Sequence, residues 1–401
     1  MKIGFVTPWY GENIPGGAEM ALRGVSRNLL EAGEEVEILT TCVKEFSADW
    51  NDNYHKPGVS VSNGILVRRF KVRKRNKHIF DSVNAKLMRG VHVSETEEKI
   101  FIREMINSPD LYKYMKDYKN EYDVYVFIPY MFGTTYYGIQ ICPEKAIMIP
   151  CFHDEAYVYM KIFRDLYSQV AGMAFNAEPE RQLTDSIYDT SQIIEVVPGL
   201  GLETDIQGNA ERFRNKYKIN DPFILYAGRK DSGKNVHTLI CYYNEYVTRH
   251  EDTNLKLVLI GGGEIEIPEE IEGRVYDLGF VDPQDKYDAY TAAEILCQPS
   301  KNESFSLVIM ESWLCHRPVL VHDKCKVTKH FVQETNGGLY FDNYFEFEGC
   351  VDYIIEHPEN AHIMGEQGRA YVLNNFTWEE VTRKYIDLFQ QVIARNEEKG
   401  V

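Results

Sequence analysis

The stretch PSKNESFSLVIMESWLCHRPVLVHD, residues 299–323, decides the fold class that the sequence predicts. A short apolar run ends at Pro299, and apolar residues then recur at helical spacing from Leu307. Pro318 ends this helix just before a second apolar run. Strand, loop, helix and strand in this order predict a parallel sheet covered by helices, and therefore an α/β fold.

Two glutamates in this stretch, Glu303 and Glu311, lie eight positions apart. In one helix they would be about 12 Å apart along its axis, more than the roughly 5–9.5 Å between the paired carboxyl groups of glycosidases. We therefore expect them to bind opposite ends of one elongated ligand, with the helix N-terminus at residues 305–307 between them. Free N–H groups there favour an anion, and a polyol, an anion and a second polyol describe a nucleotide-sugar. The alternative is an exposed loop glutamate and a solvated helix glutamate.

Glu303, followed by Ser-Phe-Ser and then by Glu311, resembles the E-x7-E element of the retaining glycosyltransferases of family four. The resemblance covers residues 3 to about 343 and is strongest in the second half. It implies the GT-B fold, an α/β architecture of two Rossmann-like domains with a nucleotide-sugar cleft between them. A glycine-containing loop near residues 198–209 predicts the domain boundary.

The resemblance assigns a role to each domain. The N-terminal domain, residues 1–198, is expected to bind the acceptor, and the C-terminal helix 377–401 is expected to pack back on it. The C-terminal domain, residues 199–376, is expected to bind the donor.

The composition is that of a globular enzyme. Of 401 residues, 44% are hydrophobic and 26% are charged, and the net charge of −17 argues against a general nucleic-acid partner, which requires a basic surface. The eight cysteines are scattered without a C-x-x-C pair, so we expect them to be reduced. The sequence contains neither a signal-peptide pattern nor an apolar run of about 18 residues. We expect a soluble, cytoplasmic protein, with peripheral contact at the inner face of the membrane as a further expectation.

The chain begins with a predicted strand, helix and strand at residues 3–8, 19–32 and 36–41. The first loop contains Gly16 and Gly17 but does not match G-x-G-x-x-G, so the dinucleotide fingerprint is absent. A Gly-Gly pair allows the backbone to approach a ligand closely, although a tight turn alone is the alternative. The resemblance implies that these glycines lie over the donor diphosphate and near the acceptor.

Two further features of the N-terminal half are candidates for acceptor binding. His153 follows the predicted strand 145–150, at the end where open α/β sheets bind ligands, and the resemblance implies a position beside the donor sugar and acceptor. A structural histidine is the alternative. Residues 67–77, VRRFKVRKRNK, form a strongly basic segment. They are either a solvated strand edge or a surface that attracts an anionic acceptor or a membrane.

The loop GRKDSGKN, residues 228–235, matches the P-loop pattern G-x-x-x-x-G-K. However, Asn235 stands where a P-loop requires a Ser or Thr hydroxyl for Mg²⁺, which argues against a nucleoside triphosphatase. Arg229 and Lys234 can instead neutralise a diphosphate leaving group. Family four carries the same residues as G-R-x-x-x-x-K, which matches Gly228, Arg229 and Lys234.

The resemblance also implies roles for residues near the helix of the opening stretch. Val281, in the turn Gly-Phe-Val, corresponds to a residue that contacts the base, and Glu311 to one that holds the ribose. Glu303 would hold hydroxyls of the transferred sugar, with help from main-chain groups of Phe305 and Ser306. Leu307 begins the helix that faces the donor.

The implied reaction is the transfer of a hexosyl unit to a hydroxyl of a glycan or lipid-linked acceptor, with retention of configuration, in surface polysaccharide synthesis. The sequence contains no D-x-D pair, so we expect no metal and no cofactor. Two alternatives stay open, a GT-B sugar-nucleotide epimerase and a non-catalytic subunit that binds nucleotide-sugars.

Overall fold

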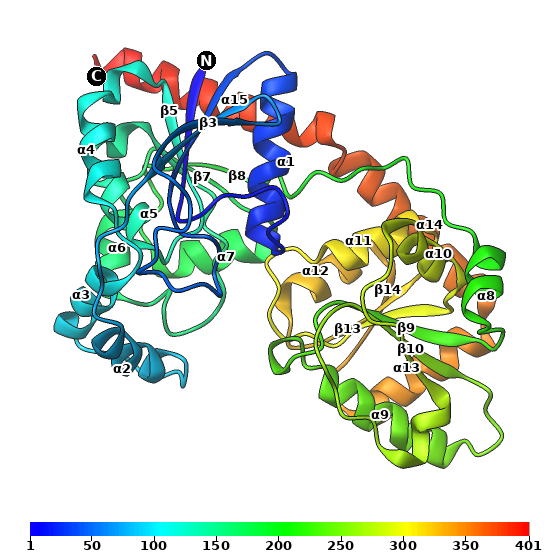
Figure 1. Cartoon of the computed structure of the whole chain (residues 1–401). Helices are drawn as coiled ribbons and strands as arrows, with labels where there is room; N and C mark the ends of the chain where they lie inside the picture. Colours follow the sequence, from blue (N-terminus) through cyan, green and yellow to red (C-terminus); the bar gives the residue numbers. More distant parts are fainter. Residues whose placement is uncertain (401) are drawn as a thin grey trace. The chain divides into compact units, whose positions relative to one another are not determined.

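The computed structural model describes residues 1–400, which form two compact units, each built on one sheet (Figure 1). The first unit comprises Met1–Gly201 and the segment from Trp378 onward, and the second comprises Leu202–Thr377. The change of unit at residues 201–202 lies close to the expected boundary at 198–199. The predicted fold class, α/β with two Rossmann-like domains, is confirmed.

The sheet of the first unit has eight strands in the order β3-β4-β2-β1-β5-β6-β7-β8. All neighbouring pairs are parallel except the edge hairpin β3–β4, which is antiparallel. Continuous apolar runs form the central strands because helices cover both faces of such a sheet. The strands are β1 (Lys2–Thr7), β2 (Glu35–Thr41), β3 (Gly58–Ser62), β4 (Ile65–Phe70), β5 (Val124–Phe127), β6 (Ala146–Met148), β7 (Gly172–Ala174) and β8 (Ile194–Val196).

The helices of the first unit include three between residues 77 and 117. They are α1 (Gly17–Glu31), α2 (Lys77–Leu87), α3 (Glu95–Glu104), α4 (Pro109–Asp117), α5 (Gly133–Ile139), α6 (Lys161–Tyr167), α7 (Glu178–Ile187) and α15 (Trp378–Lys399), with the 3-10 turns η1 (Lys119–Glu121) and η2 (Pro143–Lys145). Capping residues fix the N-termini of several of these helices. The Ser94 hydroxyl accepts from the backbone N–H of Glu97, whose side chain accepts in return, and this capping box begins α3.

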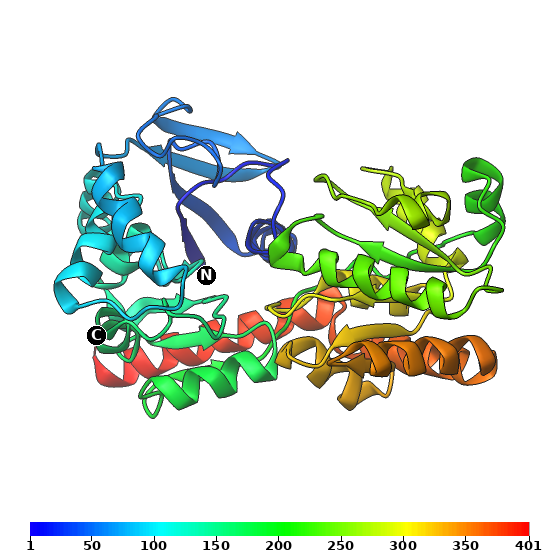
Figure 2. The same cartoon turned by 90° about the horizontal axis from the view of Figure 1, so that it is seen from below.

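The C-terminal helix α15 completes the first unit, where it lies against α1, β7 and β8 (Figure 2). Arg395 donates hydrogen bonds of 2.7 Å to the carbonyls of Ala171 and Gln192, and Asn396 donates one of 2.7 Å to the carbonyl of Glu144. These side chains therefore tie α15 to backbone carbonyls beside β6, β7 and β8 of the first unit.

The second unit has a fully parallel sheet in the order β11-β10-β9-β12-β13-β14. Its strands are β9 (Phe223–Ala227), β10 (Lys256–Ile260), β11 (Val275–Asp277), β12 (Ile295–Gln298), β13 (Val319–His322) and β14 (Gly338–Phe341). Its helices are α8 (Ala210–Tyr217), α9 (Val236–Arg249), α10 (Pro283–Ala292), α11 (Leu307–Leu314), α12 (Lys326–Thr335), α13 (Tyr344–Glu356) and α14 (Pro358–Asn375), with the 3-10 turns η3 (Ser232–Lys234) and η4 (Glu269–Arg274). Among the helices within residues 1–400, none combines the length and the apolar character needed to cross a bilayer.

A glycine in α1 makes room for the start of α15. A Cβ atom built on Gly24 would lie only 2.0 Å from the Trp378 ring, so no larger residue fits without moving the indole. We expect Gly24→Ala to lower the free energy of unfolding by about 2 kcal/mol, although alanine favours helix by about 1 kcal/mol. Urea unfolding monitored by circular dichroism measures the change.

Gly349→Ala in α13 is the matched control, because no heavy atom lies within 4 Å of a Cβ at that position. There alanine is expected to raise stability by up to about 1 kcal/mol. Equal effects of the two substitutions would contradict the packing of Trp378 on α1.

Candidate functional site

Among the parallel strands, the order reverses between β1 and β5 in the first unit and between β9 and β12 in the second. Open α/β sheets bind ligands at the carboxyl ends of the strands beside such a switch point. The candidate residues of the second unit lie in loops that leave this edge or in α11. Residues 228–235 follow β9, residues 279–281 follow β11, and residues 299–306 follow β12.

The structure brings Lys234 and Glu303 together across the switch point. The Lys234 Nζ atom lies 2.7 Å from Glu303 Oε1, and the two side chains are 25% and 10% exposed. The Asp231 carboxylate accepts from the backbone N–H of Lys234 at 3.0 Å and fixes turn η3. Asn235 donates to the carbonyl of Pro299 at 3.0 Å, so the two loops that carry the ion pair are also joined directly.

The N-terminus of α11 follows Glu303 in the same loop. Ser306 is its N-cap with φ 77°, and no side chain caps the helix. The Ser306 hydroxyl is buried without a hydrogen-bond partner among residues 1–400. The Phe305 ring is packed against Phe331 and Phe376, so only main-chain groups of Phe305 are available to a ligand. Leu307, half-buried, begins the helix.

Glu311 lies one turn further along α11, is 8% exposed, and receives one donor on each oxygen. Lys286 Nζ lies 2.6 Å from Oε1, and the Tyr290 hydroxyl donates to Oε2 at 3.0 Å. Burial lowers the pKa of Lys286, but the Glu311 carboxylate outweighs this and the pKa is raised overall. Each oxygen of Glu311 keeps a further lone pair, so the carboxylate is held in place and can still accept from hydroxyl groups.

Arg229 is not joined to this pair by any contact within residues 1–400. Its side chain is 74% exposed, and its nearest carboxylate is Asp231 at 3.5 Å. Its backbone is fixed, because the Tyr226 hydroxyl donates to the Arg229 carbonyl at 2.5 Å. Gly228, with φ 151°, precedes it and donates its N–H to the Ile260 carbonyl.

A buried lysine between these residues escaped the sequence-based prediction. Lys230 is almost fully buried, and its Nζ atom lies 2.5 Å from Asp277. The same Asp277 oxygen accepts from the N–H of Gly279 at 3.1 Å, and the N–H of Lys230 donates to the Gly262 carbonyl at 2.8 Å. The pair therefore joins the loops after β9, β10 and β11. In sequence, a lysine beside Arg229 gives no sign of burial.

The turn after β11 presents an aromatic side chain to solvent. Phe280 is 87% exposed, and a Cβ atom on Gly262 would lie 2.6 Å from its ring. Val281, the predicted base-contacting residue, is half-buried. The exposed ring therefore lies directly over the glycine loop that follows β10.

In the first unit, Gly16 and Gly17 form the turn that starts α1. Gly16 has φ 141°, a conformation that favours glycine, and the helix begins at Gly17 without a side-chain cap. A small pocket lies beside this turn at the β1–β5 switch point, lined by Thr7, Pro8, Trp9, Ala18, Glu19, Ile128 and Pro129. The indole N–H of Trp9 donates to Glu19 at 2.8 Å, so a carboxylate already lies at the start of this helix.

His153 lies in the loop after β6, where a buried carboxylate holds the backbone. The Glu180 oxygens accept from the N–H groups of Phe152 and Asn176, each at 2.7 Å. Cys151 has a left-handed φ of 57°, and the carbonyl of His153 accepts from the N–H of Glu155 at 2.8 Å. Glu180 was not predicted, because a glutamate in the first turn of a helix normally faces solvent.

No metal site is evident in the part of the chain that the structure describes. Within residues 1–400, no group of three or more His, Cys, Asp or Glu side chains is arranged to hold a metal ion.

Burial of Glu180 makes stability depend on pH. Burial raises its pKa to about 8, although hydrogen bonds from the backbone of residues 176, 152 and 151 oppose the shift. A folded-state pKa above the unfolded one contributes stability below about pH 4.5, and this contribution is lost as the pH rises toward 8. Over this window the wild type should therefore lose on the order of 4 kcal/mol relative to Glu180→Gln. Urea unfolding at several pH values measures the difference.

Glu178→Gln, a partly exposed neighbour that pairs with Arg181, is the control and should leave the pH dependence unchanged. Parallel stability curves for the wild type and Glu180→Gln would show that Glu180 does not titrate in this range.

Known proteins resemble this chain in its fold and, in sequence, mainly in its second unit. Residues 209–371 match the family model described as Glycosyl transferases group 1. D-inositol 3-phosphate glycosyltransferase of Corynebacterium glutamicum is 27% identical over 248 residues, which are 57% of this chain and 59% of that protein. An uncharacterized glycosyltransferase of Methanocaldococcus jannaschii is 23% identical over 188 residues, 44% of this chain and 47% of that protein. The chain thus spans about half the length of the curated relatives it matches.

Solved structures match over nearly the whole chain. Sucrose-phosphate synthase from Thermosynechococcus elongatus superposes with a TM-score of 0.70 at 16% identity, covering 98% of this chain and 99% of that one. Anabaena HepE in complex with UDP-glucose superposes with a TM-score of 0.66 at 14% identity, covering 98% and 100%. The chain therefore has the GT-B fold, and the segment 209–371 within its second unit matches the glycosyl transferases of group 1.

Proposed function

We propose that this chain is a retaining, metal-independent glycosyltransferase that moves a hexosyl unit from a nucleotide-diphosphate sugar to a hydroxyl of a glycan or lipid-linked acceptor. The observation that carries the proposal is the contact between Lys234 and Glu303 beside the uncapped N-terminus of α11. Both residues lie in the segment that matches the group 1 family model. The solved HepE complexes contain UDP or UDP-glucose, which supports a nucleotide-sugar as the donor.

Lys234 and Glu303 can bind different parts of the donor without separating. An ammonium group has three donors and uses one on Glu303, while a carboxylate has about four acceptor positions. Two N–H groups of Lys234 are thus available to a diphosphate, and Glu303 can still accept from sugar hydroxyls. Arg229, exposed on the same loop, is free to swing toward the diphosphate because only Asp231 is near it.

Glu311 suits the ribose of the donor. Lys286 and Tyr290 each occupy one of its oxygens and leave one lone pair on each, which matches two adjacent ribose hydroxyls. The N–H groups of Ser306 and Leu307 lie between Glu303 and Glu311 along the chain and favour the diphosphate. Val281 and the turn after β11 would contact the base.

In the proposed reaction the acceptor oxygen bonds to the anomeric carbon while the bond from that carbon to the diphosphate oxygen breaks. The departing phosphate oxygen takes the acceptor proton on the same face, so configuration is retained. The protein mainly stabilises the leaving group. His153 and the Gly16-Gly17 turn of the first unit are proposed to contribute to the acceptor and diphosphate sites.

The proposal places the enzyme in the cytoplasm, with peripheral contact at the membrane and a role in surface polysaccharide synthesis. Its support is the resemblance to family four, together with eight unpaired cysteines in the described chain. It names no metal or cofactor.

Removal of the Lys234 ammonium should abolish most transfer. We expect Lys234→Ala to lower the transfer rate about 10²–10³-fold, because a fixed charge on the leaving group is lost. Circular dichroism and the melting temperature should show a folded protein. The assay measures release of nucleoside diphosphate from a nucleotide-sugar in the presence of acceptor.

Lys324→Ala is the matched control, since Lys324 is an exposed lysine of the same unit that pairs with Asp342 at 3.2 Å. It should transfer at the wild-type rate. Wild-type transfer by Lys234→Ala would refute the assignment of the leaving-group site.

An assay with the donor and without an acceptor distinguishes a transferase from an epimerase. A panel of nucleotide-sugars is first screened for an increase in melting temperature, which identifies the donor by its stabilisation of the folded state. With that donor and no acceptor, we expect at most slow hydrolysis, followed by rapid turnover when an oligosaccharide or lipid-linked acceptor is added. Rapid conversion of the donor sugar without acceptor would favour the epimerase, and binding without any turnover would favour a non-catalytic subunit.

A further inference from the structure

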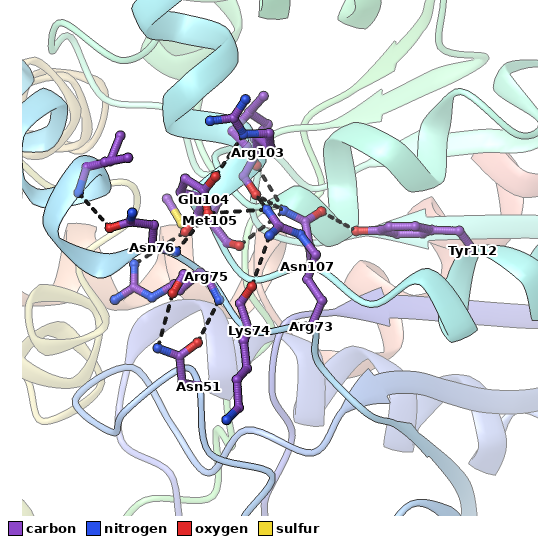
Figure 3. A network of polar contacts seen from close by, with 12 residues as sticks. Asn51, Arg73, Lys74, Arg75, Asn76, Arg103, Glu104, Met105, Asn107 and Tyr112 are labelled. Carbon is purple, nitrogen blue, oxygen red and sulfur yellow. Dashed lines mark hydrogen bonds and ion pairs between the residues drawn. The ribbon is translucent and has the colours of Figure 1, made fainter.

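The basic segment 67–77 contains arginines that serve the fold (Figure 3). The buried Glu104 carboxylate accepts from the N–H of Asn76 at 2.9 Å and from Arg103 at 2.8 Å, and lies 3.5 Å from Arg73. Arg75 packs over the rings of Trp50 and Phe80, at 4.4 and 4.7 Å. Arg73 and Arg75 therefore stabilise the loop after β4, a structural role that differs from the solvated strand edge of the sequence-based alternative.

Arg68 is also structural. Its Nε atom lies 2.7 Å from the Glu37 carboxylate, which the Tyr122 hydroxyl contacts at 2.6 Å as well. Its charge is thus balanced on the neighbouring strand β2 and is not available to a partner.

Arg69 differs from these residues because no carboxylate lies within ion-pair distance of it in residues 1–400. It donates to neutral groups, the Ser60 hydroxyl at 3.0 Å and the Tyr10 carbonyl at 3.1 Å, and its Nε atom is buried without a partner. The nearby Glu12 carboxylate accepts from Ser62 at 2.5 Å instead. A guanidinium with unused donors and no counter-charge suits an anionic ligand.

Two lysines and a histidine lie near Arg69, and we name Lys44, Arg69 and Lys71 the cationic cluster, beside which His55 lies. Burial lowers the pKa of His55, and the positive charges of Arg69 and Lys44 lower it further. Burial raises the pKa of the nearby Cys42 thiol, which Arg69 and Lys71 oppose. Lys71 is exposed, and the Lys44 ammonium lies 3.7 Å from Glu45 and 5.4 Å from the centre of the Tyr54 ring.

The cationic cluster lies at the carboxyl ends of β2 and β4. The N–H of Cys42 donates to the Phe70 carbonyl and the N–H of His55 donates to the Cys42 carbonyl, each at 2.9 Å, so the two loops are joined there. Arg69 links them to Tyr10, in the loop that continues to Gly16 and Gly17. Like charges gathered at this edge repel each other, and the net charge of the whole chain is −17.

We infer that the cationic cluster binds an anionic group, phosphate or carboxylate, of the acceptor. The inference rests on the proposed function, because the carboxyl edge of the first sheet is the ligand-binding edge of an α/β unit. The Arg69 guanidinium supplies planar N–H donors that match either anion, and Lys44 and Lys71 add charge at the rim. A neutral acceptor would leave the repulsion within the cluster uncompensated.

Calorimetric titration with inorganic phosphate at constant ionic strength tests the cluster. Arg69→Gln should weaken phosphate binding at least tenfold, because one charge-assisted contact is lost. Lys71→Gln should weaken phosphate binding several-fold. Because the Lys71 side chain is exposed, this substitution should not disturb folding. Lys77→Gln, with the same change of charge in the same segment but 68% exposed and near Asp81, should bind phosphate as the wild type does. Equal binding by the wild type, Arg69→Gln and Lys71→Gln would overturn the inference.

The donor site is a second place where phosphate can bind, so Lys234→Ala is titrated in parallel. Unchanged phosphate binding by Lys234→Ala supports the cationic cluster, and loss of binding there but not in Arg69→Gln refutes it. This comparison also separates the two proposals, since failure of transfer with intact phosphate binding at Arg69 contradicts only the proposed function.

Binding of three sugars shows which anionic group the site takes. Glucose 6-phosphate and glucuronate present a phosphate and a carboxylate on similar rings, and glucose presents neither. Tighter binding of one anionic sugar than of glucose, lost in Arg69→Gln, assigns that group to the acceptor. Equal binding of glucose and both anionic sugars would exclude an anion subsite.

Discussion

The ion pair between Lys234 and Glu303 is the contact on which the candidate donor site depends. It joins the loops that follow β9 and β12, the neighbouring strands between which the order of the second sheet reverses. Each partner is mostly buried, so removal of one would leave the other with an uncompensated charge. The pair therefore fixes a cation for a diphosphate and an acceptor for hydroxyls at a defined separation.

Other buried polar side chains fix the loops around this ion pair. Lys230 with Asp277, and Lys286 with Tyr290 and Glu311, hold backbone and carboxylates in place at neighbouring strand ends. In the first unit Glu180 does the same for the loop that carries His153. In both units, buried hydrogen-bonded side chains therefore keep the ligand-binding edge of a parallel sheet rigid.

Periodicity and glycine positions predicted the first strand, helix and strand of the fold, and the resemblance implied the return of the chain in α15. The resemblance to family four implied that Lys234 and Glu303, 69 positions apart, serve one site, and in the structure their side chains are in contact. The sequence patterns did not reveal contacts between particular side chains that are far apart in the chain. Lys230 and Asp277 are 47 positions apart, and neither has a local pattern that indicates burial. Likewise, only tertiary contacts separate the structural Arg68 from Arg69, its neighbour on β4.

The position of α15 has a consequence for biosynthesis. The ribosome makes this helix after the whole of the second unit, although the helix belongs to the first. At 5–20 residues per second, roughly 10–35 s pass between emergence of the first unit's sheet and the arrival of its final helix. During that time the surfaces of α1, β7 and β8 that α15 covers are open to chaperones and to aggregation. The nascent second unit, continuous in sequence, folds without such a delay.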